Sequence, residues 1–201
     1  MSDFEIDWIK EYLGIIPRAI LDVGSYNAND SRIFKKAYPS CRVIAFEASS
    51  INYERMVRFV KEDIEMHHLA VCDKAGVIIF NDTTGDLNGS GSIHTPNENL
   101  MVLREHIEII PETVNCTRLD TFCNKNQIGE IDVIHMDLQS AEYEALIGLG
   151  KLRPKMIFLE AGGGTFKCYD GATTPEPLLE EMGYKMLKNL RGDELWILKS
   201  L

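Results

Sequence analysis

The feature that most constrains the fold is a repeated alternation between short apolar blocks and segments with helical spacing. Apolar blocks of strand length recur at residues 18–24, 41–48, 66–72, 131–138, 155–161, 184–190 and 194–200. Helical spacing separates the early blocks, which is typical of a mostly parallel sheet with helices on both faces. The last two blocks are joined by Arg-Gly-Asp, a turn signal that predicts an antiparallel hairpin. We therefore expect an α/β fold whose parallel sheet is closed by a C-terminal antiparallel hairpin.

Length and charge narrow the class of protein. The 201 residues, 45% of them hydrophobic, suffice for one sizeable core, so we expect a single domain over residues 1–201. A net charge of -10 and the lack of any Lys/Arg block argue against nucleic acid and favour a small-molecule or glycan partner. No apolar run reaches membrane-spanning length and the first residues lack a basic region, so we expect a cytoplasmic protein with no membrane partner. The sequence leaves the oligomeric state open.

Capping residues and turn signals predict the elements between the strands. Asp30 or Ser31 can begin a helix that Pro39 helps to end, and Ser49 or Ser50 can cap the next helix. Residues 76–82 form an extra predicted strand. The polar stretch from residue 81 to residue 99 predicts a long loop, which in a compact domain is often functional.

Residues 20–30, ILDVGSYNAND, place a glycine turn after the first strand, where open α/β sheets bind ligands. Gly24 permits the tight turn, and Glu47 ends the second strand, where an acidic side chain can accept both ribose hydroxyls. The dinucleotide motif is incomplete because only its first glycine is present, so a pyrophosphate lacks its usual site. Asp22 and Asp30 add negative charge that suits an ammonium and a sulfonium. These residues together favour S-adenosylmethionine as the cofactor.

Four blocks of sequence resemble the FkbM-type S-adenosylmethionine-dependent methyltransferases. They are LDVGSYNANDS with AYPSCRVIAFEAS, HLAVCDKAG, TRLDTF with IDVIHMDLQSAEYEALIG, and FLEAGGGTFKCYDG with LLEEMGY. Their order and spacing are more specific than any single motif, and the resemblance covers residues 18–187. It implies a Rossmann-like, seven-stranded class I methyltransferase sheet, mostly parallel, with S-adenosylmethionine as cofactor.

Carried over position by position, the resemblance implies a set of cofactor contacts. They are Asp22, Gly24, Ser25 and Asp30 around the methionine part, Glu47 and Ala48 at the ribose, Leu69 and Ala70 at the adenine, and Asp137, Gln139 and Glu142 on the pocket floor. The family commonly has glycine where this chain has Ala28 and Ser140, so the backbone there has lost its freedom to adopt positive φ. If either position requires positive φ, we expect a reshaped cofactor loop or weak binding.

Methyl transfer to a hydroxyl needs alignment of the reacting atoms and a base for the proton. Asp137 is the first candidate base, although it could only bind the cofactor's ammonium. Glu160, at the end of the next strand, could bind or deprotonate the acceptor, or satisfy loop N–H groups. His94 in the predicted loop is a further candidate base and substrate contact, with plain exposure as the alternative. Tyr169 is a candidate substrate contact or a packing residue.

The remaining histidines do not indicate a metal site. His135 alternates with apolar residues of a buried strand and is expected to be a satisfied core histidine. His67 and His68 lack a partner at metal-ligand spacing, so no metal site is predicted. Asp137 and Glu160 could share a divalent cation with the acceptor, but nothing in their spacing requires one.

Three functions are compatible with these residues. The favoured one is methylation of an oxygen, less readily a nitrogen, on a sugar or other small hydroxylated metabolite. A nicotinamide-dependent oxidoreductase would use Glu47 equally well, but the missing glycines count against it. A catalytically idle cofactor-binding scaffold is the third, motivated by Ala28 and Ser140. Competition between cofactors separates the first two, and binding without turnover identifies the third.

Overall fold

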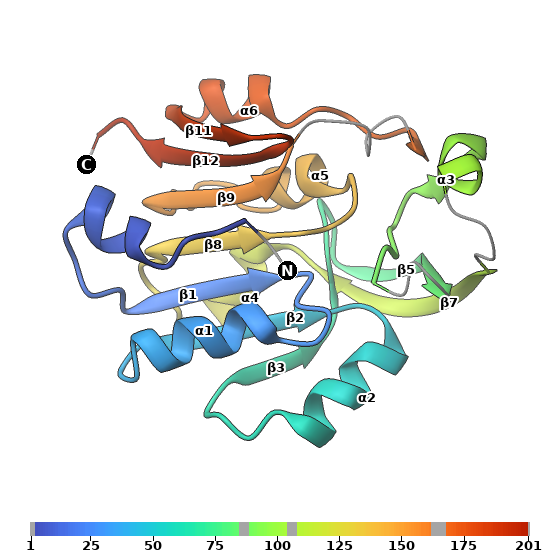
Figure 1. The fold of residues 1–201 in the computed structure, drawn as a ribbon, viewed down its shortest axis with the longest axis horizontal. Helices are drawn as coiled ribbons and strands as arrows, with labels where there is room; N and C mark the ends of the chain where they lie inside the picture. The colour runs from blue at the N-terminus through green and yellow to red at the C-terminus, as the bar shows by residue number, and fades with distance from the viewer. Residues whose placement is uncertain (1–2, 85–88, 104–107, 162–167, 201) are drawn as a thin grey trace.

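The computed structural model describes residues 3–84, 89–103, 108–161 and 168–200, and its centre is a seven-stranded sheet (Figure 1). The strand order is β11-β12-β9-β8-β1-β2-β3. The strands are β1 Ala19–Val23, β2 Arg42–Glu47, β3 Glu65–His68, β8 Val133–Met136, β9 Met156–Glu160, β11 Tyr184–Leu190 and β12 Asp193–Leu198. Neighbours pair in parallel except where β12 meets β9 and β11. The predicted class I methyltransferase sheet with its antiparallel hairpin is confirmed.

The strand order reverses at β1. From β1 the chain moves outward to β2 and β3, and later returns to the other side of β1 with β8 and β9. The carboxyl ends of β1, β2 and β8 therefore meet at one edge of the sheet (Figure 1). Such a switch point leaves a crevice between the loops that follow the strands, which is where ligands bind in open α/β sheets.

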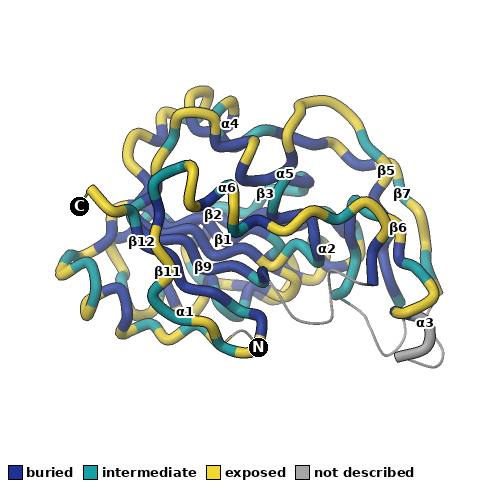
Figure 2. The backbone as a smooth tube through the Cα atoms, turned by 90° about the horizontal axis from the view of Figure 1, so that it is seen from above, coloured by how far each residue is buried: buried dark blue, intermediate teal, exposed yellow. Residues whose placement is uncertain are grey.

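Helices cover both faces of the sheet, as predicted. One face packs on the short helix η1 (Ile9–Leu13), α1 (Asn29–Ala37) and α2 (Ser50–Phe59); the other packs on α4 (Leu119–Lys125), α5 (Glu142–Ile147) and α6 (Glu176–Glu181). Alternate residues of each strand supply the two cores, so Ile20 packs with Phe34 while Leu21 packs with Phe122. Figure 2 shows the buried strands enclosed by helices with exposed outer faces. Each described helix is too short to cross a lipid bilayer.

Local signals place the ends of several elements correctly. The Ser49 hydroxyl caps α2 by accepting a hydrogen bond from the Asn52 N–H at 3.2 Å. The predicted hairpin turns at Arg191 and Gly192, whose φ angles of 61° and 126° lie in the left-handed region. A two-residue turn with positive φ at both positions matches the twist of the flanking strands.

A second sheet, β4-β7-β5, corrects two expectations. Residues 66–72 were expected to form one strand, but β3 ends at His68 and β4 (Ala70–Val71) joins β7 (Glu108–Thr117) in the other sheet. The long loop expected at residues 81–99 is also wrong, because β5 (Gly76–Thr84) extends into it and pairs with β7. Asn81 then bridges Ser92, and β6 (Thr95–Pro96) pairs with β10 (Tyr169–Asp170) before α3 (Glu98–Leu103). Residues 85–88 lie outside the described residues.

The conformations of Ala28 and Ser140 correct a third expectation. Both residues adopt positive φ, at 59° and 79°, so the two loops keep a glycine-type conformation instead of being reshaped. A side chain in this region costs about 1–2 kcal/mol. Tyr26 and Gln139, their neighbours, also have positive φ, at 50° and 51°. Four of the six described non-glycine residues with positive φ therefore lie on the two loops that flank the switch point.

Replacing Ser140 with glycine is expected to stabilise the protein. Ser140 is 1% exposed, and among the described residues its hydroxyl has no hydrogen-bond partner. Ser140→Gly removes the backbone strain and the unpaired hydroxyl, so the free energy of unfolding should rise by about 1 kcal/mol. Ser140→Ala removes only the hydroxyl and should gain less. Urea unfolding of the three proteins checks this order, and a Ser140→Gly variant less stable than the wild type would contradict it.

Candidate active site

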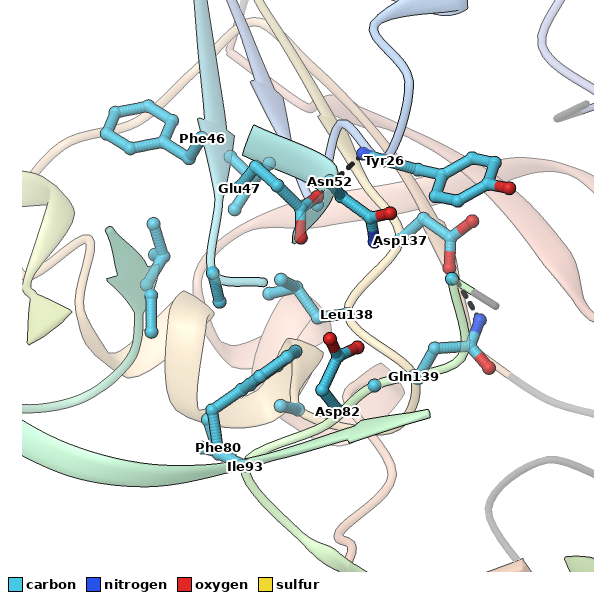
Figure 3. Close-up of a pocket in the computed structure, with 18 of the residues that line it drawn as sticks. Tyr26, Phe46, Glu47, Asn52, Phe80, Asp82, Ile93, Asp137, Leu138 and Gln139 are labelled. Carbon is cyan, nitrogen blue, oxygen red and sulfur yellow. Dashed lines mark hydrogen bonds between the residues drawn. The ribbon is translucent and has the colours of Figure 1, made fainter. Parts of the chain in front are cut away.

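A cavity lies at the carboxyl ends of β1, β2 and β8, with β5 and residues 89–93 as its opposite wall (Figure 3). Of the sequence-predicted cofactor residues, those that line it are Gly24, Glu47, Ala48, Leu69, Ala70, Asp137 and Gln139. The structure thus brings residues from three of the four resembling blocks to one space.

Gly24 allows the turn after β1 to pass directly against the end of β8. Its φ is 85°, and a Cβ atom there would lie 1.9 Å from the Asp137 carbonyl oxygen. The Gly24 and Ser25 N–H groups both donate to the Phe46 carbonyl oxygen, at 3.0 and 2.9 Å. Only glycine has both the required backbone freedom and the absence of a side chain.

Glu47 is fixed at the end of β2 by its two carboxylate oxygens. Oε2 accepts a hydrogen bond from the Tyr26 N–H at 2.7 Å, and Oε1 accepts one from the Ser49 N–H at 2.8 Å. Burial raises the pKa of Glu47 to about 8, because the loss of solvent outweighs these two hydrogen bonds. Each oxygen has a further lone pair for a ligand hydroxyl.

The cavity also contains residues that sequence reasoning missed. Asp82 and Phe80 of β5 line the cavity, and the Ser49 hydroxyl donates to Asp82 Oδ2 at 2.7 Å. Asn52 of α2 also lines it, on the side of Glu47, as Figure 3 shows. Asn52 is 3% exposed and, within the described part of the chain, its Oδ1 has no hydrogen-bond partner. The only sequence signal for Asp82 was its place at the end of the predicted strand GVIIFND.

Gln139 links the two carboxylates predicted as candidate bases. Its side-chain amide donates to Asp137 Oδ1 at 2.7 Å and to Glu160 Oε2 at 2.9 Å. All three residues line a second cavity beside the first, and Asp137 and Gln139 line both. Asp137 therefore lies between the two spaces, and the Gln139 amide joins it to Glu160, which lines the second cavity alone.

The other predicted cofactor residues lie behind the cavity. Asp22 is 1% exposed and accepts hydrogen bonds from the Ser31 N–H at 3.1 Å and from the Ser31 hydroxyl. The Ser25 hydroxyl donates to the Asp22 carbonyl oxygen at 2.8 Å, and Asp30 lies in the first turn of α1. These three residues do not line the cavity. In the described structure they hold the β1–α1 loop.

Glu142 lies beneath the floor of the cavity instead of lining it. It is fully buried, and its Oε1 accepts a hydrogen bond from the Leu138 N–H at 2.7 Å. Burial, with the nearby negative charge of Glu160, holds the pKa of Glu142 well above its usual value. The side chain thus supports the backbone that precedes Gln139.

His94 and Tyr169 lie outside both cavities. His94 Nε2 is 3.3 Å from Glu144 Oε1, beside α5. Tyr169 is 3% exposed, and its hydroxyl donates to the Ser90 carbonyl oxygen at 2.7 Å. Ser90 lines the first cavity, so Tyr169 positions a segment of that wall.

His135 departs from the expected satisfied core histidine. It is 2% exposed, and its Nδ1 lies 2.9 Å from Asp22 Oδ1. Its Nε2 has no hydrogen-bond partner among the described residues. Burial alone would lower the pKa of His135, but the hydrogen bond to Asp22 and the negative charge of Asp22 outweigh burial and raise it.

Comparison with known proteins assigns the chain to a family. Residues 22–186 match the model of the methyltransferase FkbM domain. The chain belongs to the FkbM methyltransferase family. The family's methyl donor is S-adenosylmethionine.

One curated relative of this FkbM chain is the 2-O-methyltransferase NoeI of Sinorhizobium fredii (strain NBRC 101917 / NGR234). It is 26% identical over 190 residues, which cover 88% of this chain and 77% of the relative. Two solved structures are more distant. The Podospora anserina methyltransferase PaMTH1, bound to SAH, is 13% identical with a TM-score of 0.49 over 96% of this chain and 76% of its own. The plantazolicin methyltransferase BpumL, also bound to SAH, is 12% identical with a TM-score of 0.41; the match covers 76% of this chain and 42% of BpumL.

The residues of the first cavity fit the cofactor of the family. Glu47 offers two fixed oxygens to a ribose diol, and the unpaired Asn52 Oδ1 offers an acceptor to a ligand N–H or O–H. Leu69, Phe80 and Ile93 supply apolar surface for a planar base. The close contact between Gly24 and the Asp137 carbonyl leaves no room for a side chain between the β1 turn and the end of β8.

Proposed function

We propose that this protein transfers a methyl group from S-adenosylmethionine to a hydroxyl oxygen of a sugar or another small hydroxylated metabolite. The observation that carries the proposal is the Gln139 amide, which joins Asp137, between the two cavities, to Glu160 in the second cavity. One cavity suits the cofactor, and the other leaves room for an acceptor beside it. The name of the relative, a 2-O-methyltransferase, supports oxygen as the acceptor atom.

The chain's first task is to bind and orient the cofactor. Glu47 accepts the ribose hydroxyls, Asn52 Oδ1 accepts a further hydrogen bond, and the apolar wall packs on the adenine. If Asp137 paired with the ammonium of the methionine part instead of acting as the base, Glu160 would be the candidate base. The bound cofactor supplies an electrophilic methyl group on a sulfonium.

The second task is to position the acceptor and take its proton. Holding the acceptor oxygen in line with the methyl group lowers the barrier by about 7–11 kcal/mol. As the oxygen–carbon bond forms, the sulfur–carbon bond breaks, and a carboxylate receives the hydroxyl proton. Asp137 is the first candidate because it lines both cavities. The Gln139 amide keeps the Asp137 and Glu160 side chains in place for this role.

Asp137→Asn is expected to lower the rate of methyl transfer by about 10²- to 10⁴-fold, the usual worth of a positioned base. Transfer of labelled methyl from S-adenosylmethionine to a panel of hydroxylated sugars measures this rate. Affinity for S-adenosylhomocysteine, by calorimetry, should fall less than the rate falls. Glu160→Gln reports on the other carboxylate, and Glu181→Gln at the exposed end of α6 is the matched control.

One outcome would contradict methyl transfer, and another would contradict the role of Asp137 as the base. Cofactor binding without turnover of any acceptor would identify a catalytically idle scaffold. An Asp137→Asn variant with the wild-type rate would remove Asp137 from the chemistry and leave Glu160 as the candidate.

A further inference from the structure

The second cavity is bordered by carboxylates from three strands. Asp137 follows β8, Glu160 ends β9, and Asp193 begins β12. Because β12 runs antiparallel to β9, its first residue reaches the edge where β9 ends, and Asp193 pairs with Glu160 in the register. Three carboxylates therefore line one space, which shares Asp137 and Gln139 with the cofactor cavity.

Apart from His135, the titratable side chains that line this space are carboxylates. Among the described residues that line it, none is Lys or Arg. Burial raises the pKa of Asp193, and the negative charges of Asp137 and Asp3 add to this effect, while the Asp3 N–H and His135 only partly oppose it. The described carboxylates form no set of ligands arranged to hold a metal ion. An anionic ligand entering this space therefore meets repulsion that a neutral or cationic ligand does not.

His135 provides an independent sign of a ligand. Its ring lines the second cavity, stacked on Phe158 at 5.6 Å between centroids. Its Nδ1 is engaged by Asp22, which does not line this space, and its Nε2 has no partner among the described residues. A buried polar atom without a partner is costly. A ligand hydroxyl satisfies Nε2 in either protonation state, because a hydroxyl both donates and accepts.

We propose that the second cavity is the acceptor site and that it selects neutral or positively charged polyhydroxylated acceptors against phosphorylated or carboxylated ones. The inference rests on the proposed methyltransferase function, because the acceptor must bind beside the cofactor cavity. Acceptor hydroxyls donate hydrogen bonds to the three carboxylates, and one hydroxyl pairs with His135 Nε2. Asp193 determines charge selectivity from the rim, since it is only partly buried and, unlike Asp137, lines this cavity alone.

Three probes that differ in charge test the selectivity: methyl glucoside, glucosamine and glucuronate. Their binding to the protein saturated with S-adenosylhomocysteine is measured by saturation-transfer NMR. Methyl glucoside and glucosamine should bind, and glucuronate should bind at least about tenfold more weakly, because it places a second anion near Asp193. Asp193→Asn should reduce the ratio of the glucosamine affinity to the glucuronate affinity by about tenfold.

Two controls separate selectivity from folding and from cofactor binding. Asp63→Asn removes the same charge from a side chain that is 97% exposed, in the turn between α2 and β3, and should leave that ratio of affinities unchanged. Affinity for S-adenosylhomocysteine should stay the same in both variants. The inference would be overturned if all three probes bound equally or if none bound. It would also be overturned if Asp193→Asn left the ratio of the glucosamine and glucuronate affinities unchanged. Failure of S-adenosylhomocysteine to bind would instead overturn the proposed function.

Discussion

Gly24→Ala should destabilise the protein by more than about 3 kcal/mol, enough to prevent accumulation of folded protein. The new Cβ would lie 1.9 Å from the Asp137 carbonyl oxygen, which is backbone and cannot turn aside. The substitution would also force alanine to a φ of 85°. Relief of the clash would separate the ends of β1 and β8, the two strands that frame the cofactor cavity. Thermal unfolding and soluble yield measure the loss.

Gly129→Ala is the matched control for this prediction. Gly129 lies between α4 and β8, and a Cβ atom there would meet nothing within 4 Å. This variant should unfold at about the wild-type temperature. If Gly24→Ala also unfolds at that temperature, then the close approach of the β1 turn to Asp137 is not required.

Glu47→Ala is expected to weaken S-adenosylmethionine binding by about 100-fold, the worth of two hydrogen bonds to a charged group. Glu47→Gln keeps the shape of the side chain but removes its charge, so affinity for S-adenosylmethionine should fall less than in Glu47→Ala. Glu181→Gln should bind like the wild type. Because Glu47 also holds the Tyr26 and Ser49 N–H groups, the unfolding temperature of each variant is measured alongside. Wild-type affinity in a stable Glu47→Ala variant would exclude Glu47 from the site.

The pH dependence of binding isolates the charge of Glu47. In the ligand-free protein its pKa is about 8, and the ribose hydroxyls pair best with the ionised form. Affinity for methylthioadenosine, which carries no amino acid group, should therefore rise about tenfold per pH unit from pH 6 towards pH 8 and then level off. The ligand-free fold shows the reverse trend, because a raised carboxyl pKa contributes stability below the ordinary value of 4.5 that is lost as pH rises through about 8. Glu47→Gln should abolish the trend in binding and remove the contribution of Glu47 to the trend in stability.

The seven-stranded sheet could be predicted because six of its strands carry their own apolar blocks, β3 sharing one with β4, and the connecting segments carry caps and glycine turns. Ser49, for example, caps α2 through contacts that lie within four residues of it. The second sheet depends on pairing between distant segments, which a local pattern does not contain. Pro111 made β7 difficult to recognise, since proline is tolerated only where a strand edge is open. That condition holds, because β4 pairs with β7 only at Cys116 and Thr117.

The site was predictable to a similar extent. The sequence indicated Glu47 and Asp137 because they lie at the ends of strands that meet at the switch point, and it indicated Gln139 through the family resemblance. It gave no means of telling that the Asp22 side chain turns inward to Ser31 and His135, since that choice depends on the packing of α1 against β8. Asp82 and Asn52 come from the second sheet and from a helix face, and reach the cavity only through tertiary packing. The position of Asp193 beside Glu160 likewise depends on tertiary packing, in this case on the pairing of β12 with β9.

A calorimetric titration of S-adenosylmethionine, S-adenosylhomocysteine and NADH into the purified protein tests the central claim most directly. The account predicts that both sulfur compounds bind in the micromolar to sub-millimolar range, that Glu47→Ala weakens both, and that NADH gives no response. Failure of both sulfur compounds to bind to a folded protein, or competition by NADH at the same site, would contradict it.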